Sequence, residues 1–175
     1  MKRGLPIVAL LLAALGAHAQ DDVQRLFPKA RGQDLNGRDV SLPGDFPGPA
    51  SLVFVAFEMR QQEDVDSWHA FVQALKSDNP SLAAWELPTM ARSYLLMRFI
   101  IDNGMRSGIT DRAARASTIT LYIDVKEFTR ALGLRDTKQI AVFVVTPSGE
   151  ILARAVGRFS EEGAAEISRG LKAVR

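Results

Sequence analysis

The sequence predicts an α/β domain in which helices flank a central mixed β-sheet. Short apolar runs typical of buried strands alternate with segments whose apolar residues recur at helical spacing, which indicates parallel strands joined by crossover helices. Near the end of the chain, two strand-like segments are separated only by a turn at 147–149, which adds an antiparallel hairpin. We therefore expect the order hairpin, β, α, β, α, β, α, β, β, α.

The first 19 residues have the pattern of a secretory signal peptide. Lys2 and Arg3 precede an apolar run over 5–15 and then a small-x-small cleavage site that ends at Ala19. A buried N-terminal helix and an uncleaved anchor are the alternatives, but the run is too short to span a bilayer comfortably. We expect cleavage after Ala19, a single domain over 20–175, and a periplasmic or secreted product with no membrane span.

Composition excludes several classes of function. The chain has 22 Lys and Arg against 20 Asp and Glu. Lys2 and Arg3 account for that excess, so the mature chain would have no net charge to favour nucleic acid. The chain has no Cys, which excludes thiol redox and thiol peroxidase chemistry and thiolate metal sites. It also has no phosphate-binding glycine loop and no calcium-binding loop motif, so we expect no cofactor and no metal.

The first half of the chain predicts a hairpin, a strand and a helix. Asn36-Gly37 separates two short alternating segments, which indicates a tight hairpin over 34–43, followed by a Pro- and Gly-rich loop. Residues 51–57 are continuously apolar and rich in Val and Phe, so they predict a buried strand. From Asp64 the period becomes helical. The apolar face of this helix consists of Val65, Trp68, Phe71, Val72 and Leu75.

The middle of the chain predicts a strand over 82–87 and then a helical insertion around 88–117. Thr89 is placed to cap the first helix of this insertion, which would stop at Asn103-Gly104. Residues 104–117 predict a loop with one helical turn. The apolar residues of the helix are Leu95, Leu96, Phe99, Ile100 and Ile101. They cover so much of its surface that we expect it to be sandwiched between other elements rather than exposed.

The last third of the chain predicts two helices and three strands. The elements in order are a strand over 118–124, a helix over 126–134 closed by Gly133, strands over 140–146 and 150–157, and a last helix. Ser160 is placed as the N-cap of that last helix. Its inner face would consist of Ile167, Leu171 and Val174.

Three stretches of the chain resemble the thioredoxin-like superfamily, of the exported TlpA and peroxiredoxin-like type. FPKARGQDLNGRDVSLP (27–43) is similar to the family's opening hairpin, and SLVFVAFEMRQQEDVDSWHAFVQAL (51–75) to its strand, active-site loop and first helix. IAVFVVTPSGEILARAVGRFSEEGAAEI (140–167) is similar to its closing hairpin and last helix. More loosely, DSWHAF and the long excursion over 82–117 resemble the thioredoxin-like mitochondrial ATP synthase assembly factors, which also lack a redox dithiol. The resemblance implies a thioredoxin-like fold over nearly all of the mature chain.

The chain departs from this family at its functional positions. A family member would have its Cys-x-x-Cys at Met59, Arg60, Gln61 and Gln62, and its cis-proline at about Ile140. None of these positions has the family's residue, so the resemblance implies that the redox site has been vacated. The resemblance in fold and the vacated redox site together predict a redox-inactive, non-enzymatic protein that binds or helps to assemble a protein partner in the cell envelope.

Two alternative functions stay open at this stage. In the first, Arg60, His69 and nearby carboxylates act in acid–base chemistry on a small anionic substrate. It requires one pocket that joins Arg60 and His69; the plainer interpretation is a His beside the buried helix face and acids that cap a helix. In the second, the protein is a structural interaction module that uses the surface of 88–117, where arginine is in excess. The candidate binding residues are therefore Arg60, His69, Arg92, Arg98, Arg106, Arg112 and Arg115.

Four methionines carry thioethers of the kind that bind Cu(I). They are Met59, Met90, Met97 and Met105. Methionines also fill gaps in hydrophobic cores, and we expect that role for these.

Overall fold

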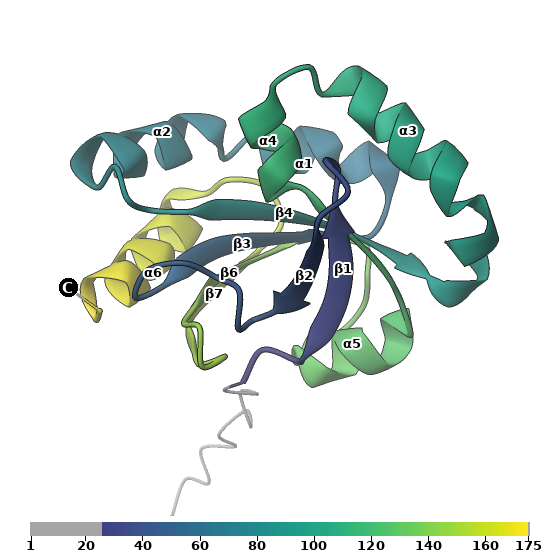
Figure 1. The fold of residues 1–175 in the computed structure, drawn as a ribbon. Coiled ribbons are helices and arrows are strands. Elements are labelled where there is room, and N and C mark those ends of the chain that lie inside the picture. The colour runs from purple at the N-terminus through teal and green to yellow at the C-terminus, as the bar shows by residue number, and fades with distance from the viewer. Residues whose placement is uncertain (1–25, 175) are drawn as a thin grey trace, which may run out of the picture.

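The computed structural model describes residues 26–174 and confirms the predicted mixed sheet between helices (Figure 1). The predicted signal peptide and its cleavage site after Ala19 lie outside the described residues and remain predictions. No helix within 26–174 is long and apolar enough to cross a membrane.

Seven strands of the described chain form one sheet in the order β2-β1-β5-β4-β3-β6-β7. Strands β3, β4 and β5 are parallel neighbours, whereas β1–β2, β1–β5, β3–β6 and β6–β7 pair antiparallel. The strands are β1 (Ala30–Asp34), β2 (Asp39–Leu42), β3 (Ser51–Ala56), β4 (Ala84–Ala91), β5 (Ile119–Ile123), β6 (Ala141–Val145) and β7 (Ile151–Val156).

Five of the six α-helices in the described chain lie in connections between these strands, and α6 follows the last strand. The α-helices are α1 (Gln62–Asp66), α2 (His69–Asp78), α3 (Arg98–Gly108), α4 (Arg112–Ser117), α5 (Val125–Ala131) and α6 (Glu161–Lys172). Two 3-10 helices, η1 (Met59–Gln61) and η2 (Arg92–Met97), directly precede α1 and α3.

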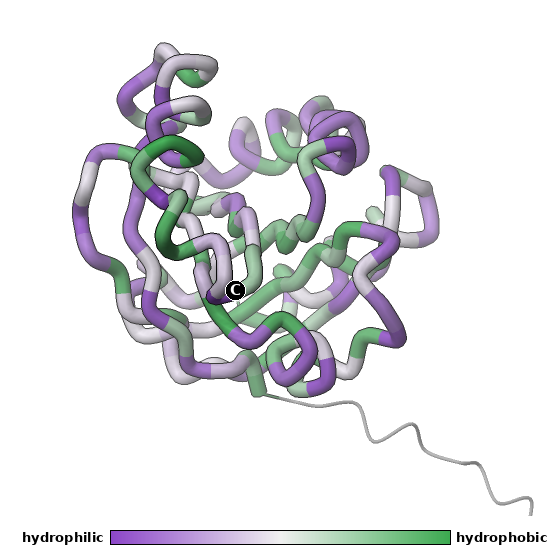
Figure 2. The backbone as a smooth tube through the Cα atoms, turned by 90° about the vertical axis from the view of Figure 1, so that its right-hand side faces the viewer, coloured by the Kyte–Doolittle hydropathy of each residue, from purple (hydrophilic) through white to green (hydrophobic). Residues whose placement is uncertain are grey.

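Hydrophobic clusters cover both faces of the sheet. Every residue of β6 and all but the last residue of β3 are buried. On one face, α1, α2 and α6 pack in a cluster that contains Trp68 and Ile167. On the other face, α5 packs with the segments around Phe27 and Phe46. In Figure 2, hydrophobic stretches cross the middle of the molecule. These two neighbouring strands therefore need cover on both faces, and the helices provide it.

Several local predictions are confirmed. The predicted hairpin forms, and Gly37 at its turn adopts a φ of 91°, which favours glycine. Gly133 follows α5 with a φ of 63°, and the Ser160 side chain accepts a hydrogen bond from the backbone of α6. Trp68, on the predicted helix face, is fully buried, and its indole N–H donates to the Gly157 carbonyl at 3.0 Å.

The predicted cap at Thr89 is wrong. Strand β4 continues past the predicted end at residue 87, and Thr89 is buried within it, with its hydroxyl donating to the Leu87 carbonyl at 3.0 Å. The strand is longer because its last three residues pair with β5. That partner lies about thirty residues away in the sequence, so a local pattern does not reveal it.

The predicted helix stop at Asn103-Gly104 and the predicted burial of the insertion are also wrong. Helix α3 continues through Gly104 to Gly108. The apolar side chains expected to be sandwiched lie mostly on the surface, with Leu96 97% exposed and Phe99 79% exposed. The physical reason is the orientation of α3, which turns its polar side toward the sheet, as described below.

Gly170 and Gly104 provide a matched test of the packing of α6 on β7. A Cβ at Gly170 would lie 2.5 Å from the Cβ of Ala153, whereas a Cβ at Gly104 would meet no atom within 4 Å. Glycine in an open helix position costs about 1 kcal/mol relative to alanine. We expect Gly104→Ala to raise the free energy of unfolding by up to about 1 kcal/mol, and Gly170→Ala to lower it by about 1–3 kcal/mol. Urea unfolding measures both, and equal stabilisation would contradict the close α6–β7 packing.

Candidate functional site

The residues at the predicted dithiol positions form a tight turn directly after β3. Met59 projects into solvent and is 95% exposed. Arg60 is also exposed and forms an ion pair with Glu58. The hydrogen bond from Arg60 lowers the pKa of the Glu58 carboxyl below its usual value, so this pair is charged on both sides.

Gln61 points the opposite way, into the protein, and is only 2% exposed. Its Oε1 accepts hydrogen bonds from the backbone N–H of Phe57 at 2.8 Å and of Glu58 at 3.3 Å. Its Nε2 donates to the carbonyl of Thr137 at 2.8 Å. This side chain therefore ties the turn after β3 to the segment that leads into β6, where Ile140 is fully buried at the predicted cis-proline position.

An open groove lies beside this turn, at the carboxyl ends of the parallel strands. Such edges commonly form the sites of open α/β sheets, because the loops after neighbouring strands meet there. The groove has a volume of about 1480 Å³ and is bordered by the segments after β3, β4 and β5 and by α5. Its apolar lining includes Phe57, Met59, Met90, Tyr94, Ile101 and Ile123.

A polar network holds the start of α3 against the sheet. Arg98 forms an ion pair with Asp102 at 3.2 Å and also donates to the side chain of Gln33 in β1. The other Asp102 oxygen accepts a hydrogen bond from the Tyr122 hydroxyl at 2.9 Å. Burial raises the pKa of Tyr122, and Asp102 raises it further, so the hydroxyl stays a neutral donor.

The next turn of α3 is fastened in the same way. Nε of Arg106 donates to the carbonyl of Leu35 at 2.7 Å. Arg98, Asp102 and Arg106 are four residues apart and so lie on one side of the helix. The polar side of α3 therefore faces β5 and the N-terminal hairpin, which leaves its apolar side facing solvent.

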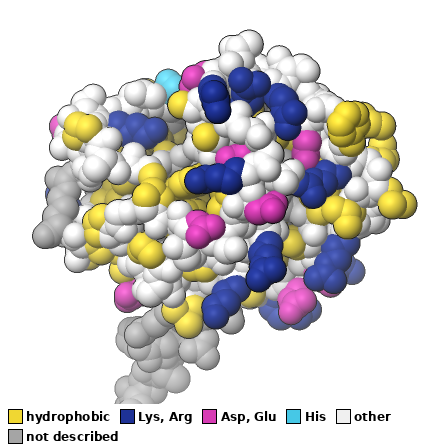
Figure 3. Space-filling view, viewed as in Figure 1, with side chains coloured by type: hydrophobic (Ala, Val, Ile, Leu, Met, Phe, Trp, Pro, Cys, Tyr) yellow, Lys and Arg dark blue, Asp and Glu magenta, His cyan; other side chains and the backbone are white. Residues whose placement is uncertain are grey.

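The outward side chains form a hydrophobic surface that we call the η2–α3 patch. Its members are the exposed residues Tyr94, Leu95, Leu96, Met97, Phe99 and Ile100. Figure 3 shows hydrophobic side chains gathered at the upper right, over the region that η2 and α3 occupy in Figure 1. The sequence analysis expected most of these residues in a buried helix face, which is wrong. Its alternative of an interaction module on 88–117 is the hypothesis that places a surface here.

His69 belongs to a different pocket from the groove. It is exposed at the start of α2 and lines a pocket of about 470 Å³ together with Asp66, Lys76, Glu86 and Asp111. Arg60 lines neither this pocket nor the groove. Arg60 and His69 are therefore not brought together in one site.

Glu86 lies on β4 in the pocket that contains His69. Burial raises the pKa of Glu86 above its usual value of 4.5. A hydrogen bond from the Gln62 amide and the nearby His69 lower this pKa, whereas the negative charge of Asp66 raises it further. Within the part of the chain that the structure describes, no three His, Asp or Glu side chains gather closely enough to hold a metal ion.

The five candidate arginines of the insertion do not form one surface. Arg92 lines the groove, whereas Arg98 and Arg106 fasten α3 to the rest of the protein. Arg112 and Arg115 belong to α4, which packs near β1 and β4. Only Arg92 of this set lies at the carboxyl edge of the parallel strands.

The four methionines do not fill the core as expected. Met59 and Met97 are exposed, and Met90 and Met105 are half-buried. Met59 and Met90 instead line the groove, where flexible thioether side chains suit a binding surface.

Gln61 tests whether the turn after β3 is fastened by buried hydrogen bonds. Gln61→Ala removes the partner of three backbone groups in a buried setting. We expect it to lower the free energy of unfolding by about 1–3 kcal/mol. Gln73→Ala, at an exposed position of α2, is the control and should stay within about 0.5 kcal/mol of the wild type. Equal effects of the two substitutions in urea unfolding would contradict the structural role of Gln61.

Glu86 predicts a pH dependence of stability. Because its pKa is raised in the folded state, folding favours the protonated form, and stability is lost as the pH rises from the usual value of 4.5 through the folded value. Glu86→Gln should therefore match the wild type at about pH 3.5 and be more stable than it at about pH 7.5. Urea unfolding at both pH values measures this, with Glu150→Gln, at an exposed position, as the control. A difference that does not change with pH would contradict it.

The sequence matches no protein-family model and no curated protein sequence. Solved structures are similar in fold. A protein of Aquifex aeolicus VF5 is 12% identical, with a TM-score of 0.60 over 87% of this chain and 98% of that one. Yeast Sco1 is 14% identical, with a TM-score of 0.58 over 85% of this chain and 96% of that one. BsSco, a member of the Sco family of cytochrome c oxidase assembly proteins, is 14% identical, with a TM-score of 0.56 over 86% of this chain and 94% of that one.

Identities this low show a likeness of fold and nothing finer. The likeness extends over most of each chain, and it agrees with the seven-stranded mixed sheet and its flanking helices. The chain therefore has the thioredoxin-like fold that its sequence predicts.

Proposed function

We propose that the protein is an exported accessory protein that binds a protein component of the cell envelope and acts without thiol chemistry. The observation that carries this proposal is the η2–α3 patch. Six large apolar side chains on consecutive turns face solvent, and extended exposed patches of this kind mark interaction sites.

The orientation of α3 supports this interpretation of the patch. An amphipathic helix normally buries its apolar side. Here Arg98, Asp102 and Arg106 hold the polar side inward through contacts with three other segments of the chain. The helix is thus fixed with its apolar side outward, as an interaction surface requires.

The turn after β3 supports an action without thiol chemistry. The chain has no cysteine, so no thiolate of its own can react. Gln61 occupies the inner side of this turn with three hydrogen bonds to backbone groups. A glutamine amide is neither a nucleophile nor a general base, and these hydrogen bonds give Gln61 a structural role.

The similar structures support an assembly role. BsSco belongs to a family of cytochrome c oxidase assembly proteins, and yeast Sco1 has been crystallised with copper bound. We carry over only the role in assembly, because thiolates, the soft ligands that favour copper, are absent from this chain.

The alternative of an enzyme that uses Arg60 and His69 finds no support in their positions. The two side chains lie in different surroundings, and Arg60 is already paired with Glu58. We therefore give no second candidate function based on these residues.

The proposal predicts that partner binding depends on the η2–α3 patch. We expect the double variant Leu96→Ser/Phe99→Ser to recover at least about tenfold less partner than the wild type when each is used for affinity capture from the native envelope fraction. Val156→Ser is the matched control, because Val156 is 50% exposed but lies on β7 at the far edge of the sheet. Both variants change only exposed side chains and should fold.

Two results would overturn the proposed function. One is undiminished capture of the same partners by the double variant. The other is reduction of insulin or turnover of peroxide by the purified mature protein above a buffer control, since the proposal allows no thiol activity.

A further inference from the structure

We propose that the groove at the carboxyl ends of β3, β4 and β5 binds an acidic amphipathic helix of the partner protein. This inference rests on the proposed function and adds the chemistry of the partner. The partner's apolar side chains would cover the groove lining and the neighbouring patch, and its carboxylates would meet the cations that surround the groove.

The groove and the η2–α3 patch are parts of one surface. Tyr94 belongs to the exposed patch and also lines the groove. Ile101, the residue after Ile100 in α3, lines the groove as well. One helix lying in the groove would therefore also contact the patch, as amphipathic helices do in hydrophobic grooves.

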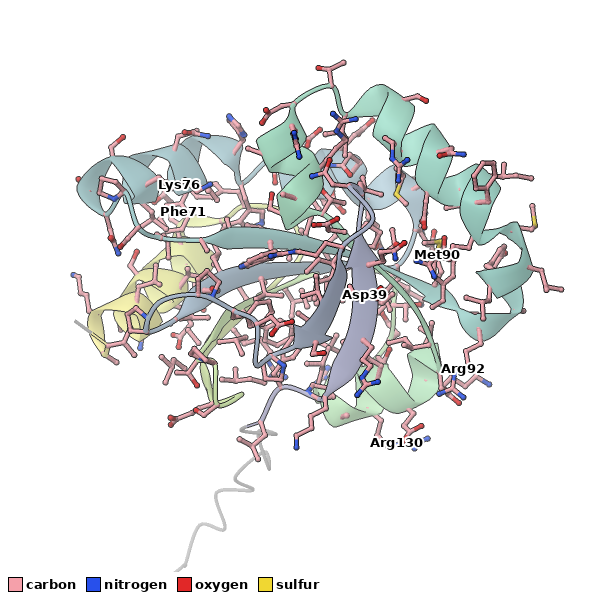
Figure 4. All side chains as sticks on the ribbon, viewed as in Figure 1. Asp39, Phe71, Lys76, Met90, Arg92 and Arg130 are labelled. Carbon is pink, nitrogen blue, oxygen red and sulfur yellow. The ribbon has the colours of Figure 1, made fainter. Side chains whose placement is uncertain are left out.

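Four cationic side chains surround the groove. They are Arg92, Lys126, Arg130 and Arg135, and all four are exposed. Figure 4 labels Arg92 and Arg130, which lie near each other below Met90. The ion pairs within residues 26–174 involve none of these four cations. They are therefore available to a ligand.

The acidic side chains of the groove are already engaged. Glu58 is paired with Arg60. Asp124 caps α5 by accepting a hydrogen bond from the backbone of Glu127 at 2.9 Å, and Asp136 accepts one from the backbone of Lys138 at 2.9 Å. Four cations of the groove lining are thus outside any ion pair of the described chain, against two carboxylates, Asp124 and Asp136, and this asymmetry favours an acidic partner.

The rest of the surface strengthens this asymmetry. Residues 88–101, which form the end of β4, η2 and the start of α3, contain two arginines and no acid. The whole chain carries nearly balanced charge, with 22 basic and 20 acidic residues. Lys2 and Arg3 account for the excess over the whole chain, and Arg98 is paired with Asp102, so Arg92 is the cation outside an ion pair that residues 88–101 add to this surface.

The size and openness of the groove favour a protein segment over a small molecule. Small-molecule sites usually have volumes of roughly 300–1,000 Å³ and enclose most of the ligand. This groove has a volume of about 1480 Å³, and it lies open to solvent and continues into an exposed patch. A small anion would remain largely hydrated there, whereas a helix would cover both surfaces.

The test uses two labelled helical peptides and the complete mature chain. Each peptide has about 15 residues, with leucine at positions i, i+3, i+4 and i+7. One carries glutamate at the remaining positions and the other carries lysine. In fluorescence anisotropy titrations, we expect the glutamate peptide to bind at least about tenfold more tightly than the lysine peptide, and its affinity to fall as salt is added.

Charge reversal assigns this preference to the groove. Arg92→Glu/Arg130→Glu should weaken binding of the glutamate peptide at least about tenfold and strengthen binding of the lysine peptide. Lys29→Glu/Lys172→Glu is the control with the same change in net charge, at two exposed cations that do not line the groove. This control should leave the preference for the glutamate peptide intact.

Three results would overturn the inference. They are equal affinity for the two peptides, an equal loss of binding in both charge-reversal variants, and binding to phosphatidylglycerol vesicles without binding of the glutamate peptide. The last result would assign the surface to a membrane. If the glutamate peptide fails to bind while Leu96→Ser/Phe99→Ser still loses the captured partner, only this inference fails. If that variant keeps its partner, the proposed function fails.

Discussion

The burial of β3 and β6 on both faces is the constraint on which the rest of the structure depends. These neighbouring strands consist almost entirely of fully buried side chains. Helices must therefore cover the two faces, and α2, α6 and α5 are used for this purpose. Little of either face is left for a ligand. The proposed binding surface is consequently confined to the edge where the parallel strands end, which is where both the groove and the η2–α3 patch lie.

Gln61 shows how this edge keeps its shape without a dithiol. A buried backbone group without a partner costs about 1–3 kcal/mol, so the turn after β3 needs internal partners. The Gln61 amide provides an acceptor for Phe57 and Glu58 and a donor for Thr137. With the inner side of the turn fixed in this way, Met59 can project from its outer side into solvent, at the border of the groove.

The sequence predicts the helices and strands better than it predicts the tertiary contacts that orient them. The hairpin at Gly37, the central strands and the Ser160 cap follow from local chemistry and are confirmed. The direction in which α3 faces does not follow, because it depends on segments far from it in the chain. Gln61 and Gln62 are equivalent in the sequence, and only the tertiary contact with Thr137 distinguishes the buried one. Long-range pairing therefore accounts for most of what the sequence could not predict about the site.

The inverted orientation of α3 connects stability with binding. Phe99 and Ile100 of α3 stay exposed, so packing of these apolar side chains cannot account for the placement of the helix. The polar network around Asp102 accounts for it instead, because it joins the helix to β5 and to the hairpin. A surface held rigidly before binding loses less conformational entropy when a partner arrives, which favours affinity. The polar contacts of α3 would therefore contribute to the proposed binding although none of them would touch the partner.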